Sequence, residues 1–169
     1  MESVTDVNYK DFSRNSSRAA LLVSTSWCQQ CKKYLPTIET LSRQMPFIRF
    51  GETVLDKDRS SQLKREYPDI RKWVLPSTVF FREQERIGKI HGLATYRELV
   101  SKVQEYLLLD TIVFVQNSDG IYIPASIKQI SGVKQPYLVK LEEDSSLGEK
   151  GTTVQIPVEK IKWGLEAKV

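Results

Sequence analysis

The spacing of apolar residues changes once along this 169-residue chain, near Asp110, and that change most constrains the fold. Before Asp110, short apolar runs alternate with segments whose apolar residues recur every three or four positions. After it, only short β-rich runs follow between turns. The run at 20–23 is typical of a buried strand, and the segment 32–44 is spaced for one face of a helix. We therefore expect two domains, at residues 1–109 and 110–169.

The first domain is predicted to be α/β, with helices packed around a central mixed sheet. Asp6 is expected to cap a first short helix, and the polar segment 82–86 is expected to join two strands as a hairpin. The other elements follow from the period of their apolar residues, with strands at 20–23, 47–55, 78–81 and 87–90 and helices at 32–44, 60–67 and 98–108.

The second domain is predicted to be small and all-β, and a five-stranded barrel is one form that it can take. The turn signal Asn117-Ser118-Asp119-Gly120 separates its first two strands. About 60 residues is near the lower limit for a domain that folds by itself, so packing on the first domain is an expected source of stability. The expected core consists of Val113, Val115, Ile121, Ile123, Leu138, Val139, Leu141, Val154, Ile156 and Trp163.

The net charge of +4 does not indicate a nucleic-acid surface, because basic and acidic residues interleave, as at 57–59 and 64–66. Residues 110–169 hold seven Lys, no Arg and eight Asp or Glu. Phosphate contacts are therefore disfavoured there, and protein docking or support of the first domain is favoured.

No apolar run approaches the roughly 20 residues that span a bilayer. The run at 19–23 is too short for a signal peptide, so we expect a mature chain that begins near Met1 and acts in the cytoplasm.

The segment Trp27-Cys28-Gln29-Gln30-Cys31-Lys32 holds both cysteines of the chain. A CxxC pair also occurs in zinc sites, but the sequence has no second pair and a single histidine, so a metal site is disfavoured. The pair falls where a predicted strand is followed by a helix, and a helix N-terminus stabilises an anion such as a thiolate. We expect Cys28 to be the exposed nucleophile and Cys31, one turn along, to be the buried resolving thiol.

Residues 3–109 resemble a thioredoxin-family domain. Pro36 lies five residues after Cys31, where the family has a proline in its helix. The segment Leu75-Pro76-Ser77-Thr78 resembles the cis-proline loop of the family, and His91-Gly92-Leu93 resembles its third substrate-facing loop. The resemblance implies a thioredoxin-like three-layer sandwich with a central mixed sheet and a cis peptide before Pro76. It also implies substrate contacts from Trp27, Leu75, Pro76, His91 and Gly92.

Five positions depart from the family pattern or stand outside it. Gln29-Gln30 replaces the dipeptides typical of thioredoxins, glutaredoxins and disulfide isomerases, and the lack of a histidine there favours a reductant over an oxidant. Leu22 stands where thioredoxins commonly carry a buried Asp that deprotonates the second cysteine. Glu52 is either a substitute base for proton transfer or a solvated strand carboxylate. Trp73 falls in a local insertion and either lines the substrate groove or belongs to the core.

The predicted function is that of a thiol–disulfide oxidoreductase that reduces protein disulfides through a Cys28/Cys31 dithiol. This chemistry needs no metal and no organic cofactor, but it needs a reductase or a small thiol to recharge the pair. The expected partners are therefore protein disulfides and that recycling partner, with neither nucleic acid nor a membrane. The alternative is a non-catalytic thioredoxin-like adaptor that binds a protein through the cis-proline groove and the β domain. Use of glutathione, as in glutaredoxins, ranks third.

Overall fold

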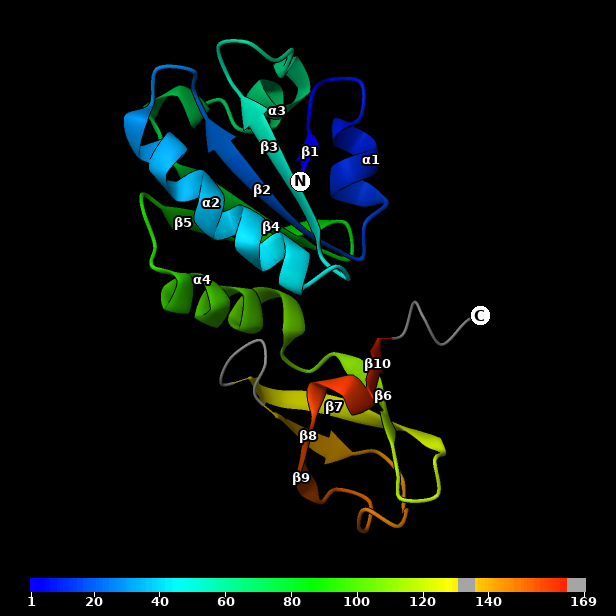
Figure 1. The fold of residues 1–169 in the computed structure, drawn as a ribbon. Helices are drawn as coiled ribbons and strands as arrows, with labels where there is room; N and C mark the ends of the chain where they lie inside the picture. The colour runs from blue at the N-terminus through cyan, green and yellow to red at the C-terminus, as the bar shows by residue number, and fades with distance from the viewer. Residues whose placement is uncertain (131–135, 164–169) are drawn as a thin grey trace. The chain divides into compact units, whose positions relative to one another are not determined.

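The computed structural model describes residues 1–130 and 136–163, which fold into two compact units (Figure 1). The units divide between Lys102 and Val103, whereas the sequence pattern placed the boundary between residues 109 and 110. The difference arises from a π-helical turn, η2 (Gln104–Leu108), which continues the helical spacing of the first unit but contacts a strand of the second. Its Leu107 and Leu108 are fully buried.

The first unit has the expected α/β architecture around a mixed sheet of strand order β1-β3-β2-β4-β5. Strand β2 runs parallel to β3 and antiparallel to β4, which forms the predicted hairpin with β5. The strands are β1 (Glu2–Ser3), β2 (Arg18–Ser24), β3 (Arg49–Val54), β4 (Ser77–Arg82) and β5 (Glu85–His91). The helices are α1 (Tyr9–Arg14), α2 (Gln29–Gln44), α3 (Ser61–Glu66), the 3-10 helix η1 (Ile70–Lys72) and α4 (Tyr96–Val103).

Helices cover both faces of this sheet (Figure 1). Because side chains alternate along a strand, β2 supplies both faces of the core. On one face Leu21 packs in a buried cluster with Phe12 of α1 and Leu63 of α3. On the other, α2 and α4 lie side by side, and Tyr96 Oη of α4 donates a hydrogen bond to Gln44 Oε1 of α2. The result is the three-layer sandwich that the resemblance implied.

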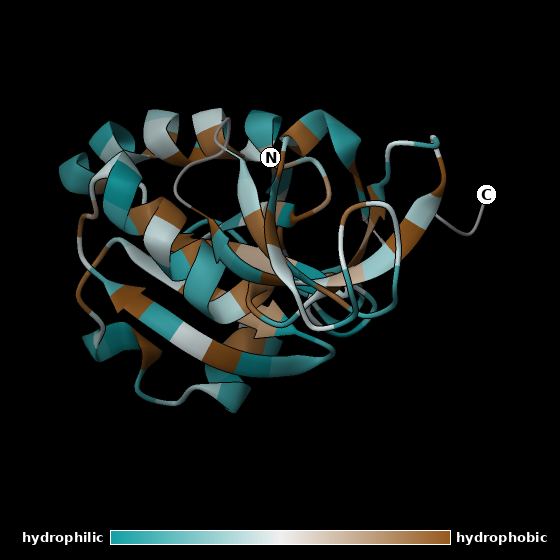
Figure 2. Cartoon of the chain, turned by 90° about the horizontal axis from the view of Figure 1, so that it is seen from below, coloured by the Kyte–Doolittle hydropathy of each residue, from teal (hydrophilic) through white to brown (hydrophobic). Residues whose placement is uncertain are grey.

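Helix α2, which begins at the CxxC, has one buried face. Its buried residues are Cys31, Tyr34, Ile38 and Leu41, spaced three or four apart as predicted. Figure 2 shows hydrophobic and hydrophilic residues alternating along the helices in this way. Packing against the sheet therefore fixes the orientation of α2, and with it the direction in which its N-terminus points.

Asp6 does not cap the first helix as expected. The N-cap of α1 is Asn8, and the Asp6 carboxylate instead accepts hydrogen bonds from the Gln62 backbone N–H (2.9 Å) and from Ser61 Oγ. These are the first residues of α3, whose own N-cap residue, Ser60, makes no capping hydrogen bond with its side chain. Asp6 thus caps a helix 55 residues further along the chain, a contact that no local pattern encodes.

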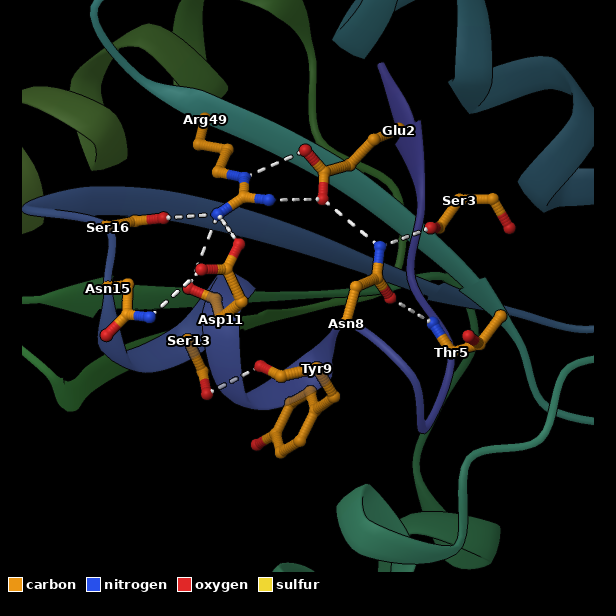
Figure 3. A network of polar contacts seen from close by, with 10 residues as sticks. All are labelled: Glu2, Ser3, Thr5, Asn8, Tyr9, Asp11, Ser13, Asn15, Ser16 and Arg49. Atoms are coloured by element: carbon orange, nitrogen blue, oxygen red, sulfur yellow. Dashed lines mark hydrogen bonds and ion pairs between the residues drawn. The ribbon is translucent and has the colours of Figure 1, made fainter.

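Arg49 of β3 ties the N-terminal segment to the sheet (Figure 3). Its Nε and Nη2 donate to the two carboxylate oxygens of Glu2 at 2.8 and 2.9 Å, and its Nη1 donates to Asp11 Oδ2 at 2.8 Å. Asn8 closes the network by donating from Nδ2 to Glu2 Oε1. The bidentate pairing with Glu2 holds β1 on β3, and the contact with Asp11 holds α1 there.

The second unit is an antiparallel five-stranded sheet of strand order β10-β6-β7-β8-β9. Its strands are β6 (Ile112–Gln116), β7 (Tyr122–Ile130), β8 (Tyr137–Leu141), β9 (Thr153–Ile156) and β10 (Ile161–Trp163). The five expected strands are present. Within the described residues, however, β9 and β10 do not pair with each other, so the sheet stays open and does not close into a barrel.

The predicted core of this unit is correct in part. Six of its members are buried, namely Val113, Val115, Ile123, Val139, Leu141 and Ile156. Leu138 and Val154 are half-buried, and Ile121 is 61% exposed because it ends the turn begun by Asn117, whose Oδ1 accepts the Ile121 N–H. The side chain of Trp163 lies outside what the structure describes. Tyr137 and Ile127 are buried instead.

None of the helices within residues 1–130 and 136–163 is long and apolar enough to cross a membrane.

Candidate active site

The CxxC lies where β2 ends and α2 begins, as the sequence predicted. Cys28 is the N-cap residue of α2 in an extended conformation, and its Sγ accepts a hydrogen bond from the Cys31 backbone N–H at 3.1 Å. The two cysteines form a disulfide with a Cα–Cα distance of 5.3 Å. An N–H aimed at Sγ and the positive end of the α2 dipole both favour a thiolate on Cys28 after reduction.

The two cysteines differ in what surrounds them more than in how exposed they are. Cys28 is 7% exposed and Cys31 4%, so in the disulfide form the expectation of an exposed Cys28 is wrong. Cys28 is nevertheless one of the residues that line a pocket. Cys31 is not part of that lining and lies on the buried face of α2. Of the two sulfur-bearing residues, Cys28 is thus the one that faces the pocket.

Two of the loops expected to contact substrate are joined to each other. The Leu75–Pro76 peptide is cis, as the resemblance implied. The Gly92 N–H donates to the Pro76 carbonyl oxygen at 2.7 Å, and Gly92 has a φ of +75°, which favours glycine. His91 is exposed and pairs with Ser77 in the β4–β5 hairpin.

A pocket of about 630 Å³ opens beside Cys28. Of the predicted substrate-contacting residues, Trp27 and Leu75 line it, whereas Pro76, His91 and Gly92 do not. Trp73 belongs to the core, at 8% exposed within the buried cluster, and it also lines the pocket, while its contact with a substrate stays a prediction. The complete lining is Thr25, Trp27, Cys28, Gln29, Gln30, Leu55, Asp56, Lys64, Ile70, Arg71, Trp73 and Leu75.

Asp56 is one of several pocket residues that sequence reasoning missed. Its carboxylate accepts hydrogen bonds from the Ser26 backbone N–H (2.7 Å) and from Ser26 Oγ, and so holds the loop that leads to Cys28. These bonds, that of the Ser26 hydroxyl first, lower the pKa of Asp56 below its ordinary value. The sequence pattern could have indicated this position. Asp56 follows β3, which runs parallel to β2, and parallel strands end at the same edge of a sheet, so Asp56 is expected near the CxxC.

Glu52 lies outside the pocket. It stands on β3 opposite Leu22 of β2, which is fully buried, and its Oε1 accepts a hydrogen bond from Ser24 Oγ at 2.8 Å. It lines a separate, smaller hollow together with Glu39 of α2 and Lys57. Its role as a base in proton transfer therefore stays a prediction. Across the part of the chain that the structure describes, no three His, Cys, Asp or Glu side chains gather in a way that could hold a metal ion.

The sequence model of the thioredoxin family matches residues 1–105, which hold the whole first unit and the CxxC. The chain belongs to the thioredoxin family. A thioredoxin domain that carries the Cys28–Cys31 disulfide supports thiol–disulfide oxidoreductase activity.

Solved thioredoxin structures share this fold. Mitochondrial thioredoxin 3 of Saccharomyces cerevisiae, in its oxidised form, is 21% identical, covers 62% of this chain and 94% of its own, and has a TM-score of 0.53. Thioredoxin O2 of Arabidopsis thaliana, also oxidised, is 17% identical, covers 63% of this chain and 93% of its own, and has a TM-score of 0.53. Plasmodium falciparum thioredoxin is 16% identical, with 63% and 99% covered and a TM-score of 0.54. No curated protein matches this chain in sequence.

Proposed function

We propose that this thioredoxin-family chain is a reductase of protein disulfides. The observation that carries the proposal is the position of Cys28. It caps α2, is bonded to Cys31, and opens onto a pocket of about 630 Å³ next to the cis-proline loop. A side chain or backbone segment of a substrate protein can enter such a space, and its disulfide then lies beside the nucleophile.

The reaction proceeds by two thiol–disulfide exchanges. The Cys28 thiolate attacks one sulfur of the substrate disulfide, forms a mixed disulfide and releases the other substrate sulfur as a thiolate. The Cys31 thiolate then attacks Cys28 Sγ and releases the second substrate thiolate, which takes up a proton. The substrate gains two electrons and becomes a dithiol, while the chain is left as the Cys28–Cys31 disulfide. A reductase or a dithiol small molecule restores the reduced pair, and neither a metal nor an organic cofactor takes part.

Insulin reduction driven by dithiothreitol tests this proposal. The wild-type chain is expected to accelerate the reduction, Cys28→Ser to abolish the acceleration, and Cys31→Ser to accumulate a mixed disulfide that a non-reducing gel detects. A folded wild-type chain with no acceleration would contradict a reductase and favour the non-catalytic adaptor. Such a result would be explained by Leu22, which stands where thioredoxins commonly carry a buried acid.

We also propose that the reductase acts in the cytoplasm, where the thiol pool keeps a dithiol reduced. Rapid acid quenching of cells, followed by alkylation of free thiols, should then find the Cys28–Cys31 pair mainly reduced. A fully oxidised pair in unstressed cells would contradict this location.

A further inference from the structure

We propose that the pocket beside Cys28 selects substrates that carry a bulky apolar residue next to the reacting cysteine and a carboxylate close by. This inference rests on the proposed function and names the substrate class of the same site. It follows from two properties of the pocket, its apolar walls and the positive charge of two residues that line it, Lys64 and Arg71.

The walls of the pocket suit an aromatic or large aliphatic side chain. Trp27 is 70% exposed although it is apolar, and Leu55 and Leu75 are half-buried facing the same space. Ile70 and Trp73, both buried, line it as well. The volume of about 630 Å³ is within the range of pockets that hold small ligands, so a single large side chain fits with room for the backbone beside it. Apolar surface that remains exposed here is buried when such a side chain enters.

The wall that carries Trp73 is held in place by its neighbours. The Tyr67 and Trp73 rings pack with their centroids 5.6 Å apart. Nζ of Lys89, a residue of β5, lies 3.5 Å from the centroid of the Trp73 ring. Arg86 in turn lies 4.5 Å from the centre of the Tyr67 ring. The pocket is therefore preformed, and filling it does not require this wall to be rebuilt.

Two basic residues, Lys64 and Arg71, line the pocket. Lys64, in the last turn of α3, donates from Nζ to the Leu55 carbonyl oxygen at 3.2 Å, which fixes its ammonium group at the pocket. Arg71 of η1 also lines the pocket. The one acidic residue of the lining, Asp56, already accepts two hydrogen bonds from Ser26, which orient its carboxylate toward the cysteine-bearing loop. A carboxylate on the substrate is therefore attracted to Lys64 and Arg71, and a cation there is repelled.

A panel of disulfide-linked peptide dimers tests this selectivity with the full chain. Each peptide carries phenylalanine or serine next to its cysteine, on either side, and glutamate or lysine one position further out. Dithiothreitol recycles the reductase, and kcat/KM is compared between peptides. The phenylalanine peptides are expected to react at least about 10-fold faster than the serine peptides. Glutamate should be preferred to lysine several-fold, by a ratio that shrinks as salt is added.

Two charge-reversal variants separate the charge of the pocket lining from the general charge of the domain. Arg71→Glu is expected to abolish or invert the ratio between glutamate and lysine peptides. Arg97→Glu makes the same change at an exposed position of α4 and is expected to keep the wild-type ratio. If both variants change the ratio equally, the preference comes from net charge, and the assignment to the pocket lining is overturned.

Two further measurements distinguish failure of this inference from failure of the proposed function. Bis(2-hydroxyethyl) disulfide has no side chain to fill the pocket, so its reduction reports thiol–disulfide exchange alone. If it is reduced while all peptides react equally, the function stands and the selectivity is wrong. If no disulfide is reduced, the selectivity is tested by peptide binding instead of by reduction. Peptides with serine in place of cysteine are added to the oxidised chain, and the Trp27 and Trp73 indole signals are followed by NMR. Equal shifts with phenylalanine and serine peptides would overturn the inference.

Discussion

Asp56 is the single residue on which the conformation of the loop before Cys28 depends most directly. Its carboxylate, at the end of β3, accepts both hydrogen-bond donors of Ser26, one residue before Trp27. Because these bonds lower the pKa of Asp56, ionised Asp56 stabilises the folded state. That contribution is fully present above the unfolded pKa and is lost as the pH falls through the lower, folded pKa.

The Asp56→Asn variant tests this linkage. We expect the variant to be less stable than the wild type by a constant amount between about pH 7 and pH 5, and the difference to shrink as the pH falls below about 4. Urea unfolding at a series of pH values measures it, with Asp119→Asn, at an exposed position of the other unit, as the control. A difference that grows on acidification would show that the ionised carboxylate does not stabilise the loop.

Leu22 is the second residue with a consequence for catalysis. It is fully buried in the sheet, where it pairs with Glu52 of β3 and Thr78 of β4, so it offers no group that can accept a proton from Cys31. We predict that Leu22→Asp speeds the release of mixed disulfides several-fold. The same change should lower stability, because burying an unpaired polar group costs roughly 2–7 kcal/mol.

Stopped-flow measurement of mixed-disulfide resolution tests this prediction, and Leu22→Asn is the matched control. The amide buries a similar polar group but takes no proton. If the Asp and Asn variants resolve at the same rate, proton acceptance at this position is not limiting. Glu52→Gln then shows whether Glu52 serves as the base in the wild-type chain.

At the scale of elements, helix α3 depends on a residue from the N-terminal segment. Its own Ser60 makes no capping hydrogen bond with its side chain, and Asp6 supplies the cap through the Gln62 N–H and Ser61 Oγ. The same contacts lower the pKa of Asp6. Since α3 carries Lys64, the position of this helix also decides where one of the two basic residues of the pocket lies.

We therefore predict that Asp6→Ala destabilises the first unit by about 0.5–2 kcal/mol, the usual cost of losing an N-cap side chain. Chemical denaturation followed by the tryptophan fluorescence measures it. Asp69→Ala is the control, because Asp69 is the N-cap residue of η1 but makes no capping hydrogen bond. An equal loss in both variants would mean that charge, and not capping, accounts for the effect.

At the scale of the whole molecule, residues 103–109 determine where the chain can be divided. They continue from the last residue of α4 without a break in helical spacing, yet Leu107 and Leu108 are fully buried and the turn that they form contacts β7. The Asp110 N–H also donates to the Ile127 carbonyl oxygen of β7. A β unit that begins at Asp110 therefore lacks part of its own core.

A pair of fragments tests this division. We predict that residues 103–169 unfold at a higher temperature than residues 110–169, because the shorter fragment loses two large buried side chains, each worth about 2–5 kcal/mol on truncation to alanine. Circular dichroism melting compares the two fragments. Equal melting temperatures would place residues 103–109 with the first unit, as the sequence pattern had suggested.

Local pattern in the sequence was enough to predict most elements and the place of the CxxC. A strand at 20–23 followed by a helix at 32–44 already puts Cys28 and Cys31 at a helix start, because period and burial depend on neighbouring residues. The same holds for the β4–β5 hairpin and for the five strands of the second unit. The residues around Pro76 were sufficient to predict the cis peptide, through the family resemblance.

The tertiary structure alone decided the contacts that join distant segments. Asp6 was expected to cap the nearest helix, but packing brings it to α3, and Asp56 reaches Ser26 only because β2 and β3 end together. The pocket collects Trp27, Arg71 and Trp73 from separate loops and helices, and the open edge between β9 and β10 likewise depends on pairing between strands. Such contacts form between residues tens of positions apart. Their geometry is set by how whole elements pack, a property that the period of any one segment does not contain.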